Sequence, residues 1–169
     1  MEECLSVLTR TPTVLDALLR DLPDVLTTAT DGPGTWSPFI VVGHLIHAER
    51  TDWMPRMKII MEHGASRAFE PFDHEAQFRQ PELRSLPVLL EEFRELRRDS
   101  LSRLRAMNLT TELLGKNGLH PALGVVTARQ LLATWTSHDL GHILQITRVM
   151  ARRYKPDVGP WVAYQSVMK

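Results

Sequence analysis

Apolar residues recur at the three- and four-residue spacing of amphipathic helices in four blocks of the sequence, and no stretch keeps the alternation of a half-buried strand. The first block, rich in leucine, opens the chain, and Pro12 inside it predicts a kink or a fresh helix start. The second begins after a loop that contains glycine and proline, where Ser37 can cap a helix and Pro38 can occupy its first turn. It extends to about Glu62, and Pro55 predicts a bend late in this helix.

The third and fourth blocks fill the second half of the chain. An apolar stripe runs from about Ser85 to Met107, and charged residues are dense on the other faces of that helix. The fourth block begins at Thr127, whose side chain can form a capping box with Gln130, and it continues to about Arg153. The four blocks together predict an all-α fold of four amphipathic helices of bundle length.

Two connections are longer than the tight turns of a simple bundle. About twenty mostly polar residues separate the second and third helices, and residues 108–126, with room for one helical turn, separate the third and fourth. We therefore expect a four-helix bundle with crossover connections, which leaves one end open where a site can form. The length of 169 residues fits one domain that spans residues 1–169.

Composition and charge argue against several classes of protein. The 20 basic and 20 acidic side chains cancel, which gives no electrostatic reason to expect nucleic-acid binding. The single cysteine, Cys4, rules out an internal disulfide, and the first residues lack the basic-then-apolar order of a secretory signal. The longest apolar stretch, Phe39–Ile46, is far shorter than the ~20 residues of a membrane helix. We expect no membrane insertion and a cytoplasmic location.

Two histidines in the fourth helix are spaced to share one face. His138 and His142 are four residues apart, so both imidazoles leave the same side of the helix and can hold one ion. Spacing alone is a weak signal in a chain with seven histidines. The helix is predicted to be buried, with Leu140 among its core residues, and buried imidazoles need a polar partner or a metal ion. Gly141 in mid-helix predicts the close approach of a neighbour or a ligand.

The second helix carries two further histidines. His44 lies within an apolar run and follows a glycine, as a ligand that faces the core would. His47 is about 60° further round the helix and leads into a polar segment, so only one of the two is expected to face the bundle axis. For either residue alone, an ordinary hydrogen-bonded histidine is the commoner explanation. The position favours His44 as the third ligand and leaves His47 as a donor of a hydrogen bond to the site.

The order of several short motifs resembles the DinB-like superfamily over nearly the whole chain. These motifs are Trp36-Ser37 before Gly43-His44-Leu45 and Glu49, Pro121-Ala-Leu-Gly124 before Thr127, His138-Asp139-Leu-Gly-His142-Ile-Leu-Gln145, and Gly159-Pro160-Trp161. The resemblance implies a four-helix bundle in which one histidine of the second helix and two of the last long helix bind a divalent metal ion. The matching positions are His44, His138 and His142.

The chemistry of this ligand set agrees with the resemblance. Three neutral imidazoles and no carboxylate suit zinc or nickel, and they leave at least one coordination position for water or substrate. Gln145, seven residues after His138, and Thr134, one turn before it, are candidates to orient that water or substrate. Polar residues at the edge of a bundle explain both equally well. His120 is a candidate fourth ligand, which would close the site.

Charged residues near the ligands have structural explanations as well. Asp139 and Glu49 can accept hydrogen bonds from the ligand imidazoles. Asp139 directly follows His138 and so lies on a different face of the helix, which favours a structural hydrogen bond for it. The arginines of the third helix, Arg97 among them, are interleaved with acidic residues and predict a solvated face rather than a nucleic-acid patch.

Two classes of function stay open. The resemblance implies a metal-dependent enzyme that acts on a small-molecule substrate, either a hydrolase or a transferase that uses a low-molecular-weight thiol. The alternative is a noncatalytic metal-binding or stress-related bundle protein. An open position on the ion favours the enzyme, and a closed fourth ligand favours a structural role. A homodimer is expected, with Trp161 and Tyr164 either at its contact or sealing the bundle end.

Overall fold

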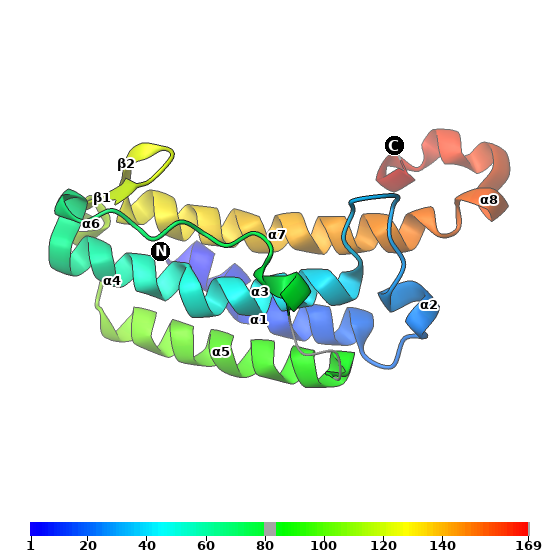
Figure 1. The fold of residues 1–169 in the computed structure, drawn as a ribbon, viewed down its shortest axis with the longest axis horizontal. Coiled ribbons are helices and arrows are strands. Elements are labelled where there is room, and N and C mark those ends of the chain that lie inside the picture. The colour runs from blue at the N-terminus through cyan, green and yellow to red at the C-terminus, as the bar shows by residue number, and fades with distance from the viewer. Residues whose placement is uncertain (80–83, 169) are drawn as a thin grey trace.

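The computed structural model describes residues 1–79 and 84–168, and four long helical segments in it pack side by side as a bundle (Figure 1). These segments are α1 (Glu2–Leu19), α3 (Pro38–Thr51) continued by α4 (Trp53–His63), α5 (Leu86–Ala106) and α7 (Ala128–Arg152). Short helices and 3₁₀ turns lie between and after them: α2 (Asp24–Thr27), η1 (Gly64–Ser66), η2 (Ala76–Arg79), α6 (Thr111–Leu114), α8 (Lys155–Val158), η3 (Gly159–Tyr164) and η4 (Ser166–Met168). The predicted four-helix bundle is confirmed.

Two of the long helices begin at the predicted caps. The hydroxyl of Ser37 accepts a hydrogen bond from the N–H of Ile40 at 3.3 Å, and Pro38 is the first residue of α3. Thr127 caps α7, and its side chain and that of Gln130 make both hydrogen bonds of a capping box. These bonds satisfy backbone N–H groups that a helix start leaves without an intrahelical partner.

Prolines affect two helical segments in different ways. α1 continues through Pro12 as one helix, so the fresh start considered there is not found. Pro12 has no N–H to donate to the carbonyl of Leu8, and Nη1 of Arg97 on α5 donates to that carbonyl at 3.0 Å. The second segment does break, at Asp52 (φ −108°, ψ −70°), shortly before Pro55. The bend predicted from Pro55 therefore separates α3 from α4.

The connection between α5 and α7 contains a two-stranded hairpin that the sequence pattern did not predict. β1 (Asn117–His120) and β2 (Gly124–Thr127) pair in antiparallel register. Strands of this length are too short to show a clear alternation in the sequence. Gly118 allows β1 to approach α4, because a Cβ atom there would lie 2.6 Å from Cγ1 of Ile60. Among the described residues, this hairpin is the one sheet, and a single further bridge joins Ala68 to Leu119.

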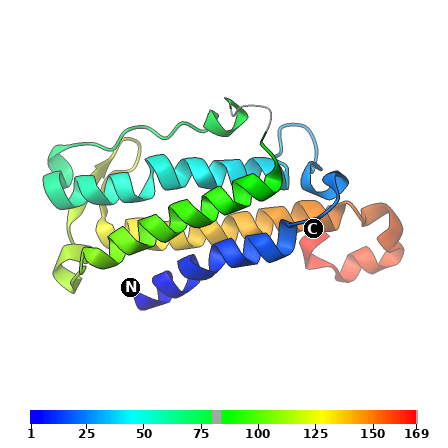
Figure 2. The same ribbon diagram turned by 90° about the horizontal axis from the view of Figure 1, so that it is seen from below.

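The connection after α4 crosses the bundle, as its length predicted. From η1 it runs back along α4 and α3 to η2 before the chain enters α5 (Figures 1 and 2). Phe72 on this connection lies against α3, with its ring centroid 5.5 Å from that of His44. The crossover therefore covers the face of α3 that carries His44.

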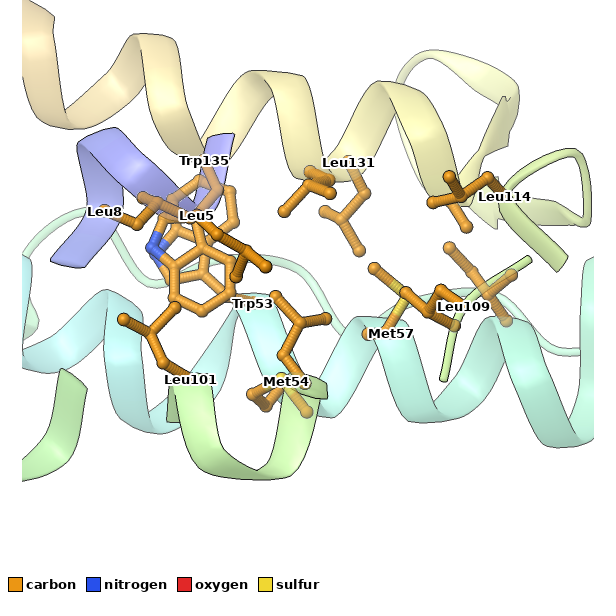
Figure 3. Packing of buried hydrophobic residues seen from close by; sticks show 14 of the residues in the cluster. Leu5, Leu8, Trp53, Met54, Met57, Leu101, Leu109, Leu114, Leu131 and Trp135 are labelled. Atoms are coloured by element: carbon orange, nitrogen blue, oxygen red, sulfur yellow. The ribbon is translucent and has the colours of Figure 1, made fainter. Parts of the chain in front are cut away.

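Two clusters of buried side chains fill the bundle. In one of them the indoles of Trp53 and Trp135 stack with ring centroids 5.7 Å apart (Figure 3). The other includes Phe93 of α5. Leu140 of α7 belongs to neither and is 51% exposed, so its predicted place in the core is wrong. It lies about 200° round the helix from the inward-facing His138. Every helix in the described part of the chain is too short or too polar to span a lipid bilayer.

Candidate metal centre

Three histidines from two helices meet at one point. Nε2 of His138 lies 3.0 Å from Nε2 of His44 and 3.1 Å from Nε2 of His142. The three candidate ligand atoms all lie within 4.8 Å of one another. Within residues 1–79 and 84–168, no other group of three or more His, Cys, Asp or Glu side chains is close enough to share one ion. The structure thus brings together the three residues named from the sequence.

Helix geometry explains why these three side chains converge. His138 and His142 lie one turn apart on α7, and α3 packs against α7 with His44 on the buried face. His47 is half-buried and outside the histidine group. Its Nε2 lies 3.4 Å from the hydroxyl of Thr51 on its own helix. Of the two histidines of α3, His44 is the one that lies beside the histidines of α7.

Two of the three distances between the nitrogens match those of ligands on a single ion. With metal–nitrogen bonds of about 2.0–2.1 Å, two neighbouring ligands are about 2.9–3.4 Å apart for bond angles from octahedral to tetrahedral. The two shortest contacts, 3.0 and 3.1 Å, fall in this range. A set of three imidazoles also matches the ligand preference of zinc and of other late first-row ions. The residues present therefore fit a divalent ion.

Burial keeps the three imidazoles neutral. Desolvation, with the neighbouring histidines adding to it, lowers the pKa of His44 from 6.5 to about 4 and that of His138 from 6.5 to about 3. Desolvation also lowers the pKa of His142, against the opposing effect of its hydrogen bond to Gln145. The neutral ring is the form that offers a lone pair to a metal ion, so the three nitrogens are ready to bind one at neutral pH.

Gln145 holds the outer nitrogen of one ligand ring. Its Oε1 lies 2.8 Å from Nδ1 of His142. A hydrogen on Nδ1 leaves the lone pair of Nε2 for an ion, and the bond fixes the plane of the ring. Gln145, which the sequence suggested as a residue that orients water or substrate, is thus placed to orient His142.

A second glutamine, Gln77 of η2, interacts with the imidazole of His44. Its side chain interacts with His44 and raises the pKa of that imidazole against the larger effect of burial. Gln77 is buried, and its Nε2 donates to the carbonyl of His74 at 2.5 Å, which leaves Oε1 as the acceptor of the amide. Among the described residues, Oε1 of Gln77 and Nδ1 of His44 are both buried, and neither has a hydrogen-bond partner. Sequence reasoning missed Gln77 because it lies in an irregular connection, where no periodicity marks the buried face.

A cavity of 740 Å³ opens onto the imidazoles. Its walls are largely aromatic: the ring centroid of Trp36 lies 4.9 Å from that of His44, and the centroid of Trp53 lies 5.0 Å from that of His138. This volume falls within the roughly 300–1,000 Å³ of sites for small organic ligands. The histidine group is therefore accessible to a molecule much larger than water.

Thr134 and His120, both named from the sequence, line this cavity without joining the histidine group. Nδ1 of His120 accepts hydrogen bonds from the backbone N–H groups of Ala122 at 3.1 Å and Leu123 at 3.2 Å. These bonds tie the ring to the hairpin turn. A fourth ligand from His120 is therefore not found within the described part of the chain.

A buried ion network connects α5 to the two helices that carry the candidate ligands. Nη1 and Nη2 of Arg97 bind the carboxylate of Asp139 at 2.6 and 3.0 Å, and Nε binds Glu49 at 2.8 Å. The indole N–H of Trp135 also donates to Glu49, at 3.1 Å. Asp139 has the structural role that its position favoured. The solvated face predicted for the arginines of this helix is wrong at Arg97, which is 1% exposed.

Comparison with known proteins agrees with the fold. The family model of the DinB superfamily matches residues 8–146. Among solved structures, YfiT from Bacillus subtilis, described as "a probable metal-dependent hydrolase with an unusual four-helix bundle topology", is similar with a TM-score of 0.77 and 22% sequence identity over 90% of this chain and 86% of that chain. No curated protein matches. The match over most of the chain, on a bundle of the same kind, shows that this protein belongs to the DinB superfamily.

Proposed function

We propose that this protein is a metal-dependent enzyme whose one divalent ion, zinc or nickel, is held by His44, His138 and His142. The observation that carries the proposal is the convergence of three neutral imidazoles on the wall of an open cavity of 740 Å³. Three protein ligands are the number found in catalytic zinc sites, where a further position takes water or substrate. The description of YfiT as a probable metal-dependent hydrolase supports the same class.

An ion held by these three histidines would acidify bound water or a bound thiol, and so would supply hydroxide or thiolate near neutral pH. The chain's own residues prepare the site for that chemistry. Burial keeps the ligand rings deprotonated, and Gln145 fixes the ring of His142. The indoles of Trp36 and Trp53 provide flat apolar walls against which the body of a small substrate can pack.

Two reactions fit this arrangement. A hydrolase would use water as the nucleophile, and a transferase would use a low-molecular-weight thiol. Both need a small-molecule substrate beside the ion, and the cavity has room for a thiol and a second reactant. The competing function, a noncatalytic metal-binding bundle, requires that neither thiol nor exchangeable water reach the ion.

Metal analysis followed by a thiol titration tests the proposal. Protein produced in zinc- and nickel-supplemented medium should contain about one divalent ion per chain. It should release the ion only as the pH falls toward about 4, where the shielded imidazole of His44 takes up a proton. Cobalt- or nickel-substituted protein should then show a new thiolate-to-metal absorption band when a low-molecular-weight thiol is added.

The outcomes separate the candidate functions. Less than about a tenth of an equivalent of metal in both media would contradict the metal site. A stoichiometric ion that exchanges neither water nor thiol would favour the noncatalytic bundle. The matched control is His63→Ala, which removes an exposed histidine of α4 and should leave both metal content and thiol band unchanged.

A further inference from the structure

A second, smaller pocket lies beside the candidate metal centre. It measures 240 Å³ and is formed by the loop before α3 and the C-terminal half of α7. Its lining includes Asp31, Thr35 and Trp36 from the loop and Gly141, Gln145 and Arg148 from α7. We call it the Arg148 pocket. Trp36 lines both this pocket and the larger cavity.

Arg148 gives this pocket an uncompensated positive charge. Its Nε is buried and has no hydrogen-bond partner within residues 1–79 and 84–168. The carboxylate that lines the same pocket, Asp31, forms its ion pair with Arg152. A buried guanidinium nitrogen without a partner is costly, because it has lost its water without gaining an acceptor. An anion in the pocket would supply that acceptor.

Gly141 points to a ligand at the same place. A glycine in mid-helix destabilises the helix relative to alanine and calls for a reason. Close packing by another part of the protein is not that reason, because a Cβ atom built at Gly141 meets nothing within 4 Å. The residue instead forms part of the pocket wall, where any side chain would take up space open to a ligand.

We propose that the Arg148 pocket binds a small organic monocarboxylate. The guanidinium fork of arginine pairs with the two oxygens of a carboxylate. Two guanidinium groups and one carboxylate, from Arg148, Arg152 and Asp31, leave a local charge of about one positive unit. Asp31 therefore disfavours a second negative charge, as on phosphate. The volume of 240 Å³ lies below the roughly 300–1,000 Å³ of drug-sized sites, so a small flat or short-chain acid packs between Trp36 and the Gly141 backbone.

The pocket also borders the candidate metal centre. Gln145 lines it and accepts the hydrogen bond from His142 at 2.8 Å. A carboxylate held by Arg148 would therefore share the pocket with the residue whose amide orients one candidate ligand. Binding at Arg148 itself requires no metal ion, so this proposal can be tested independently of the proposed enzymatic function.

Benzoate is a suitable probe because it joins one carboxylate to a flat apolar ring that can pack on Trp36. We expect a saturable shift of the Trp36 indole and Arg148 Nε–H resonances in NMR titrations, with equal affinity in metal-free and metal-loaded protein. Arg148→Gln should weaken binding at least ~10-fold, as expected for loss of a charge-assisted hydrogen bond. The matched control Arg153→Gln removes an exposed arginine at the end of the same helix and should change affinity less than ~2-fold.

A second variant tests the shape of the pocket. Gly141→Leu keeps every charge but fills the wall, and it should abolish benzoate binding while circular dichroism shows a folded helical protein. The proposal is overturned by the absence of a saturable shift up to about 100 mM benzoate. Unchanged affinity in Arg148→Gln, binding only in the metal-loaded form, or tighter binding of inorganic phosphate than of benzoate would each overturn it too.

Discussion

The three candidate ligands are held in their orientations by two different kinds of contact. His142 has the amide of Gln145 at its Nδ1, and Gln77 lies against His44. Nδ1 of His138 is buried without a hydrogen-bond partner among the described residues, and the indole of Trp53 packs edge-on against its ring. An amide hydrogen bond orients the ring of His142, and aromatic side chains pack against the rings of His44 and His138.

The first prediction is that His44, and not His47, is the third ligand. His44→Ala should weaken zinc binding by at least ~10-fold to 100-fold, because it removes one of three converging nitrogens. His47→Ala should weaken it by ~10-fold at most, since its ring lies outside the group and contacts Thr51. Competition with a chelator of known zinc affinity measures both. Equal or greater loss in His47→Ala would mean that α3 presents the other histidine to the ion.

The second prediction concerns the two glutamines. Gln145→Leu and Gln77→Leu should each lower zinc affinity by about 10-fold, because the ring that loses its amide can turn or take up its proton on Nε2. Nitrogen-15 NMR of labelled histidine should show the Nε2-protonated tautomer rising at His142 or His44 respectively in the metal-free variants. Gln165→Leu, at an exposed site near the C-terminus, is the control. Unchanged tautomers in either variant would assign that glutamine to packing alone.

At this scale the sequence predicted the residues that helical spacing can relate. The four-residue spacing of His138 and His142 fixes their common face, and the apolar run before His44 marks the buried side of α3. The position of Gln77 beside α3 could not be predicted, because a long irregular connection brings it there and no local sequence pattern indicates where that connection lies.

At the scale of helices, Arg97 joins all four long segments of the bundle. It lies on α5 and donates to the Leu8 carbonyl of α1, to Glu49 of α3 and to Asp139 of α7. Glu49 and Asp139 lie on the same helices as the candidate ligands. The network therefore fixes how α3 and α7 sit relative to each other, and with them the two halves of the histidine group.

The third prediction is that Arg97 is a main determinant of stability. Arg97→Met leaves two buried carboxylates and the Leu8 carbonyl without their cation, and it should lower the free energy of unfolding by about 3–5 kcal/mol. Arg98→Met, at the adjacent exposed position, should change it by less than about 0.5 kcal/mol. Urea unfolding followed by circular dichroism measures both. A similar effect of the two substitutions would show that the network contributes little.

The sequence contains evidence that Arg97 is buried, but the charges around it suggested the opposite. Four-residue spacing from Phe93 and to Leu101 puts Arg97 on the apolar stripe of α5, whereas the alternation of charges around it suggested a solvated face. The starts of α3 and α7 could be predicted from the sequence, because Ser37 and Thr127 form their capping hydrogen bonds with residues only three positions further on. The hairpin was not predictable, because its short strands pack through Gly118 against a distant helix.

At the scale of the whole molecule, connection length was the informative feature. A connection of about twenty residues cannot be a tight turn, and in the structure it crosses the bundle and brings Phe72 beside the candidate centre. The two aromatic residues of the C-terminal segment are not buried in the way the sequence suggested. Trp161 and Tyr164 are 70% and 83% exposed, so they do not seal the bundle end within one chain. Their place in a homodimer stays a prediction.

The last prediction concerns the pH dependence of the stability of the metal-free protein. Burial lowers the pKa of His138 in the folded state to about 3, while in the unfolded chain it is near the ordinary 6.5. As the pH falls below about 6.5, the unfolded state takes up a proton that the folded state does not. The free energy of unfolding is therefore highest above pH 6.5 and decreases as the pH falls from there toward the folded-state pKa of about 3. His44, with its pKa lowered to about 4, acts in the same direction.

Glu49 and Asp52, whose pKa values burial raises, oppose this effect because they favour proton uptake by the folded state. A difference between two proteins therefore isolates the histidine. Between pH 7 and pH 5, wild type should lose about 1–2 kcal/mol more unfolding free energy than His138→Leu, which has no imidazole to protonate at this position. Urea denaturation at the two pH values, after removal of metal by dialysis, gives this difference. Equal losses in the two proteins would mean that His138 takes up its proton as readily in the folded state as in the unfolded one, and hence that its ring is not shielded from water by the bundle.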